Sequence, residues 1–155
     1  MITFKKLQDE NNIKDLIKSI FDADLDLSGG WGYTQENATI INTLPKGMPL
    51  NQLQHMVTSI RAHLEMNITQ AQDNRYGGIN ANERARKESK NDKGIFNKVT
   101  YALTAMQEDI YTVFIKEYKK NYGKEDFDLN AHFKRRAEAT LTQEVIHHFE
   151  VSQLS

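Results

Sequence analysis

The chain has 155 residues, a net charge of −1, 26% charged residues and no cysteine. This length predicts a single domain, residues 1–155, that can bury a core without disulfides or a structural metal. The absence of cysteine excludes disulfides, thiolate nucleophiles and cysteine-ligated zinc or iron–sulfur sites. Near-neutral charge gives no general attraction to nucleic acid or to an anionic membrane, so we expect neither as a partner.

The sequence shows neither a signal peptide nor an apolar run of the roughly 18 residues that a membrane span needs. We therefore expect a cytoplasmic protein. Its lysine, asparagine and isoleucine content is typical of AT-rich bacterial coding sequences, which suggests a bacterial origin.

Four segments space their apolar residues as helices do: 4–21, 50–68, 107–122 and 129–150. Pro49 precedes the second segment, where its missing N–H costs nothing. The third begins with acidic residues and ends with lysines, which matches the helix dipole. The fourth has an apolar or alanine side chain at every fourth position from Leu129 to Phe149, which predicts one continuous helix with Asp128 as its N-cap.

Two pairs of strands are expected between these helices. Residues 98–104 alternate between apolar and polar, and a turn at 91–94 lets 84–90 pair with them as a charged edge strand. Residues 24–27 and 38–42 form the second pair. Residues 81–92 have helix propensity but no apolar stripe, so strand is favoured there.

The resulting order is helix, strand pair, helix, strand pair, helix, helix. It predicts an α+β domain in which about four helices pack against one face of a small antiparallel sheet built from the two strand pairs. The alternative is an all-α bundle, which follows if the weak strands do not form.

Two glycine-rich loops flanked by aromatic residues, 28–34 and 75–80, are the strongest candidates for a ligand site. Glycine permits close backbone approach, and an aromatic ring offers a flat face to a ligand. Neither loop has a phosphate-binding signature, and the alternative is that Trp31 and Tyr33 pack into the core. The predicted ligand-binding residues are Gly29, Gly30, Trp31, Tyr33, Arg75, Tyr76, Arg84 and Arg86.

No complete catalytic or metal-binding set is recognisable. Glu144-x-x-His147 has the spacing of a di-iron helix but lacks the second copy that such a centre needs. Asp22, Asp24 and Asp26 begin like a calcium loop, but the required glycine and glutamate are absent. The sequence therefore predicts no metal site and assigns neither a cofactor nor catalytic residues.

These observations favour a non-catalytic ligand- or protein-binding module that forms a homodimer. Its functional surface is expected where Trp31, Tyr33, Arg75 and Tyr76 meet.

The alternative is a small nucleotide- or phosphoester-handling enzyme. Gly29 and Gly30 would then hold the phosphates, Arg84 and Arg86 would neutralise them, and Asp24 or Asp26 would bind a divalent metal. This hypothesis requires the first glycine loop, Asp24 and Arg84 to converge in one pocket.

Overall fold

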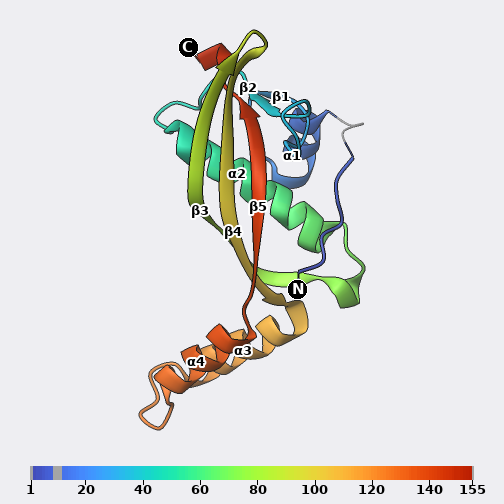
Figure 1. The fold of residues 1–155 in the computed structure, drawn as a ribbon. Helices are drawn as coiled ribbons and strands as arrows, with labels where there is room; N and C mark the ends of the chain where they lie inside the picture. The colour runs from blue at the N-terminus through green and yellow to red at the C-terminus, as the bar shows by residue number, and fades with distance from the viewer. Residues whose placement is uncertain (1, 9–11, 155) are drawn as a thin grey trace.

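The computed structural model describes residues 2–8 and 12–154, and its centre is one five-stranded sheet (Figure 1). The strands are β1 (Leu27–Gly29), β2 (Thr39–Ile41), β3 (Tyr76–Asn91), β4 (Gly94–Gln107) and β5 (Leu141–Glu150). Their order across the sheet is β1-β2-β5-β4-β3. Neighbouring strands are antiparallel except β2 and β5, which are parallel.

The described residues also form four α-helices: α1 (Ile13–Phe21), α2 (Leu50–His63), α3 (Glu108–Asn121) and α4 (Leu129–Ala139). Helix α2 lies across one face of the three long strands and continues into a π-helical turn at Leu64–Ile68 (Figure 1). Short 3₁₀ turns occupy Gln72–Asn74 and Ser152–Leu154. Helices α3 and α4 extend beyond the end of the sheet.

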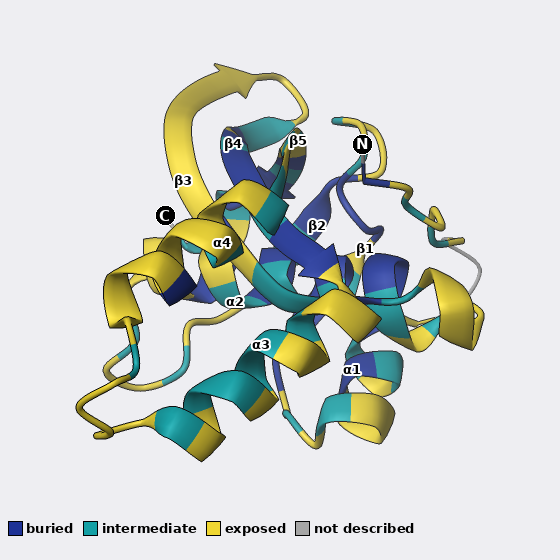
Figure 2. Cartoon of the chain, turned by 90° about the horizontal axis from the view of Figure 1, so that it is seen from below, coloured by how far each residue is buried: buried dark blue, intermediate teal, exposed yellow. Residues whose placement is uncertain are grey.

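The main core lies between α2 and the sheet. Leu53 and Val57 of α2 pack among Val99, Tyr101 and Leu103 of β4, and each of these side chains is at most 1% exposed. Helices α3 and α4 stand apart from this core and are mostly exposed or half-buried (Figure 2).

Helices α3 and α4 instead share a small aromatic cluster around His132, which is fully buried. Its imidazole ring contacts four aromatic rings, at centroid distances between 5.5 and 5.8 Å: Phe114, Tyr118, Phe127 and Phe133. His132 Nδ1 also lies 3.1 Å from Glu117 Oε1, and Arg135 pairs with the same carboxylate. Phe114 and Tyr118, both in the predicted helix 107–122, therefore pack within this helical pair.

The α+β class is confirmed, whereas the predicted sheet is too small and the all-α alternative is wrong. Both predicted strand pairs belong to one sheet, completed by β5. Residues 81–92 lie largely in β3, which is a charged edge strand as expected. The predicted helix 129–150 ends at Ala139, and residues 141–150 form β5.

The predicted helix 4–21 begins only at Ile13. Asn12 caps it, because its side-chain oxygen accepts hydrogen bonds from the backbone N–H groups of Lys14 and Asp15 at 3.0 and 3.3 Å. Residues 2–8, called the strap below, have neither helical nor strand structure. The remainder of the predicted N-terminal helix, residues 9–11, lies outside the described residues.

Candidate functional site

The strap is held in place by a tyrosine from each of the two predicted loops. The Thr3 N–H donates to the Tyr76 hydroxyl at 2.9 Å, and the Leu7 N–H donates to the Tyr33 hydroxyl at 3.1 Å. Both tyrosines come from the predicted site, but they act here as acceptors for the backbone. The two aromatic loops therefore contact the same N-terminal segment.

Further hydrogen bonds tie the strap to the end of the α2 region. The Lys5 N–H donates to the Glu65 carbonyl at 3.0 Å, and Lys5 Nζ donates to the Thr69 carbonyl at 3.2 Å. The Gln70 side chain donates to the Thr3 carbonyl at 3.1 Å. These contacts fix the strap across the π-helical turn.

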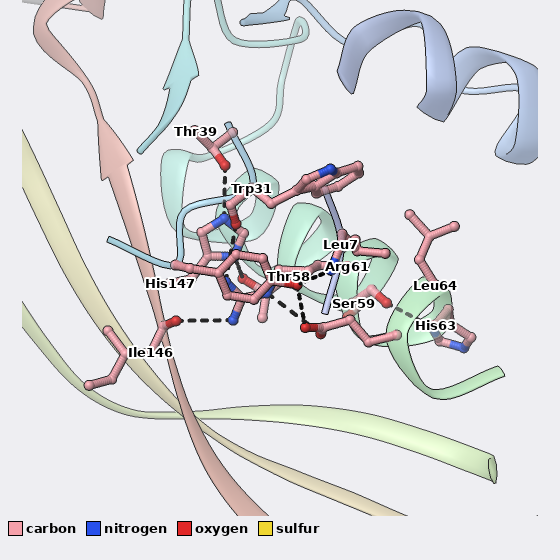
Figure 3. Close-up of polar contacts among 12 residues, drawn as sticks. Leu7, Trp31, Thr39, Thr58, Ser59, Arg61, His63, Leu64, Ile146 and His147 are labelled. Atoms are coloured by element: carbon pink, nitrogen blue, oxygen red, sulfur yellow. Dashed lines mark hydrogen bonds and ion pairs between the residues drawn. The ribbon is translucent and has the colours of Figure 1, made fainter. Parts of the chain in front are cut away.

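A polar cluster of the half-buried Tyr33 and the buried Arg61 and Glu65 lies beneath the strap. Arg61 and Glu65 are 2% and 4% exposed. The Tyr33 hydroxyl donates to Glu65 Oε2 at 2.5 Å, and Arg61 Nε lies 3.8 Å from Glu65 Oε1. The Arg61 guanidinium also donates to the carbonyls of Trp31 at 3.1 Å and Ile146 at 3.0 Å (Figure 3). Arg61 thus joins α2 to the first glycine loop and to β5.

Burial governs the ionisation of this cluster. It raises the pKa of the Glu65 carboxyl and of the Tyr33 hydroxyl, and it lowers the pKa of Arg61. The Arg61 guanidinium lies 4.8 Å from the centre of the Tyr33 ring. Each group forms hydrogen bonds or ion contacts with its neighbours in place of the water that they lose on burial. Removing one member therefore leaves a buried polar group unpaired.

His147 of β5 makes a second buried connection to the first glycine loop. Thr39 Oγ1 and Thr58 Oγ1 lie 2.9 and 3.0 Å from its two ring nitrogens (Figure 3). Thr39 also donates a hydrogen bond to the Gly30 carbonyl. Burial holds the pKa of His147 well below its ordinary value, so the ring is neutral at neutral pH. The ring is fully buried, which gives it a structural role.

Gly32 fits against that imidazole ring. Its φ is +78°, and a Cβ at this position would lie 2.6 Å from both His147 Nε2 and the His148 carbonyl oxygen. The second loop is similar, because the Tyr111 ring covers Gly77 and Gly78. The glycines at these positions therefore allow a ring of the protein itself to approach the backbone.

An apolar cleft of about 320 Å³ opens beside the strap, and its volume lies in the range of small-molecule sites. Ile20 of α1 and Ile68 of the π-helical turn are each 41% exposed, whereas Trp31 is fully buried. The cleft's apolar lining consists of Leu7, Leu16, Ile20, Trp31, Leu64 and Ile68, and its polar lining of Lys5, Lys6, Gln8 and Thr69. We call it the strap cleft.

The groups required by the phosphoester hypothesis are not brought together. Gly29 ends β1 and Arg84 lies in β3, and these strands form opposite edges of the sheet. Arg86 forms a two-pronged ion pair with its neighbour Glu83, at 2.7 and 3.1 Å. Asp24 is near Lys14, at 4.0 Å.

Arg75 lies outside the strap cleft. It lines a larger depression of about 530 Å³ together with Asp73, Glu108 and Asp109. Its Nε donates to the Gln70 carbonyl at 3.2 Å, which supports the turn that holds the strap. The depression combines charged side chains of both signs, as solvated protein surface does.

Sequence reasoning missed Arg61 and Glu65, although a signal was present. They are the only arginine, lysine, aspartate or glutamate residues in segment 50–68, and their i, i+4 spacing places them side by side on one helix face. The spacing pattern counts Ile20 among the apolar residues of one predicted helix and places Ile68 beside the apolar stripe of another. Spacing alone does not reveal how far each of these side chains is covered.

No protein-family model, curated protein or solved structure matches this chain. Within residues 2–8 and 12–154, no three histidine, aspartate or glutamate side chains are grouped so that they could hold a metal ion. Over the same ranges, every helix is too short or too polar to cross a membrane.

Proposed function

We propose that the protein is a non-catalytic binding module that takes up the apolar part of a small ligand in the strap cleft. The observation that carries this proposal is the exposure of Ile20 and Ile68, at 41% each, on two different elements that line one cleft with Trp31. A ligand that covered the exposed part of these side chains would gain about 1 kcal/mol from each.

The polar groups beneath the cleft support binding rather than chemistry. Arg61, Glu65 and Tyr33 bond one another and nearby backbone atoms. Their arrangement stabilises the loop that carries Trp31, and it leaves hydrophobic contact as the principal interaction that the cleft offers.

Trp31 makes the proposal directly testable, because it is the only tryptophan in the chain. We expect an unbranched alkyl alcohol, used as an uncharged probe, to change the Trp31 fluorescence saturably at equimolar stoichiometry. The double variant Ile20→Gln/Ile68→Gln is expected to bind at least about tenfold more weakly, since about 2 kcal/mol of apolar contact is lost.

The matched control is Ile110→Gln/Val113→Gln, which removes two exposed apolar side chains from α3, 37% and 62% exposed. This control should bind the probe as the unaltered protein does. An unchanged fluorescence signal at all probe concentrations, or an equal loss in both double variants, would refute binding in the strap cleft. Native mass measurement of the same sample tests the predicted homodimer.

A further inference from the structure

We infer that the ligand of the strap cleft is a soluble single-chain amphiphile with an anionic head group, which Lys5 and Lys6 attract. The inference rests on the proposed function, because it concerns the polar end of a molecule whose apolar part occupies the same cleft.

The first support is the charge of the cleft lining. Lys5 and Lys6 both belong to it, and within residues 2–8 and 12–154 no other residue of the lining is charged. Neither ammonium group has a carboxylate within 4.0 Å in the described part of the chain. An anion at the mouth of the cleft would therefore meet two positive charges.

The second support is the placement of the two ammonium groups. Lys5 Nζ donates one hydrogen bond, to the Thr69 carbonyl, and Lys6 Nζ lies 4.9 Å from the centre of the Tyr33 ring. An ammonium group carries three donors, so each lysine keeps donors for a ligand oxygen. Because both contacts restrain the side chains near the cleft, less conformational entropy is lost on binding.

The third support is that the nearby buried carboxylate does not neutralise the lysines. Glu65 is 4% exposed and already accepts the Tyr33 hydroxyl, with Arg61 beside it. The positive charge of Arg61 offsets the negative charge of Glu65. The described side chains in and directly beneath the cleft therefore keep, as their net charge, the two positive charges of the lysines. Carboxylates, sulfates and phosphate monoesters with one alkyl chain share the complementary chemistry.

The test compares three probes of equal chain length: an alkyl carboxylate, the alcohol and the amine, each below the concentration at which it forms micelles. We expect the carboxylate to bind about threefold to tenfold more tightly than the alcohol, and the amine most weakly, as for two partly exposed charge contacts. The double variant Lys5→Gln/Lys6→Gln should bind the carboxylate and the alcohol equally.

The matched control replaces the adjacent lysines of α3, as Lys119→Gln/Lys120→Gln, and should keep the preference for the carboxylate. Unchanged alcohol binding in the Lys5/Lys6 variant shows that its cleft is intact.

Each other outcome has a distinct meaning. Equal binding of carboxylate and alcohol to the unaltered protein overturns the inference and leaves the proposed function standing. Failure of all three probes refutes the proposed function as well. Binding to anionic lipid vesicles without binding of the dissolved carboxylate would overturn the inference in favour of a membrane surface.

Discussion

Replacing Gly32 with alanine should destabilise the protein through two separable effects. The first is backbone strain, because the φ of +78° costs a residue with a Cβ about 1–2 kcal/mol. The second is overpacking, because the new methyl group would lie 2.6 Å from His147 Nε2 and from the His148 carbonyl oxygen. Overpacking in a closed core costs about 1–3 kcal/mol, so the two effects together amount to about 2–5 kcal/mol.

Gly47 provides the matched control, because it has the same φ of +78° but no described atom lies within 4 Å of the place that a Cβ would take. Gly47→Ala therefore retains the strain and lacks the overpacking, and the restriction of the unfolded chain by alanine is the same in both variants. We expect this variant to lose no more than about 1–2 kcal/mol.

The assay is equilibrium unfolding in urea, followed by far-ultraviolet circular dichroism. Gly32→Ala should lower the midpoint by about 1–2 M, with an unchanged slope. Since small domains have only about 5–15 kcal/mol of stability, this is a substantial fraction of the total. If Gly32→Ala and Gly47→Ala lose equal stability, the close packing of the glycine loop on His147 is not the reason for glycine at position 32.

Two further predictions concern the buried polar groups. Tyr33→Phe removes the hydroxyl that links the strap to Glu65, so it should lower the free energy of unfolding by about 1–3 kcal/mol and speed hydrogen exchange of the strap amides. The control is Tyr122→Phe, at a site that is 69% exposed. Equal amide exchange in both variants would contradict the linkage. The low pKa of His147 means that the unfolded chain takes up a proton that the folded protein excludes, so stability should fall as pH drops below about 6.5, by up to about 1.4 kcal/mol per pH unit. The raised pKa of Glu65 makes the opposite contribution, because the folded protein takes up this proton more readily than the unfolded chain does. Urea titrations between about pH 7 and pH 5 should therefore show a steeper loss of stability in Glu65→Gln than in the unaltered protein. A stability that stays flat or rises in this variant as the pH falls would refute the assignment of the loss to His147.

The fold class could be predicted from the sequence, but the number of strands could not. A spacing of four residues is ambiguous, since it keeps side chains on one side of a helix and is also a multiple of the two-residue repeat of a strand. Leu141, Val145 and Phe149 satisfy both patterns. The sheet decides between them, because β4 and β2 supply backbone partners on both sides of β5, and those partners are distant in the sequence.

The candidate site was predicted only in part. Trp31 does line the strap cleft, and Tyr33 and Tyr76 do meet one common segment. The segment they meet could not be predicted, because residues 2–8 carry a helix-like pattern and their position depends on hydrogen bonds to residues far along the chain. Whether the predicted residues bind a ligand stays a prediction.

The position of the helical pair α3–α4 determines which part of the sequence can be altered without altering the strap cleft. Leu141 begins β5 and is the register partner of Ala105, close to the end of β4 at Gln107, so the segment between β4 and β5 leaves the sheet and returns to it at neighbouring positions. Glu108 accepts a hydrogen bond from Asn67 of the π-helical turn, and the Tyr111 ring covers Gly77 and Gly78, so the start of α3 supports the strap region. None of the described residues beyond Tyr111 in this segment lines the strap cleft, so evolution or an engineer could shorten, exchange or graft residues 112–140 while the cleft is retained. The chain thus has one part suited to acquiring new surfaces and another that can remain constant.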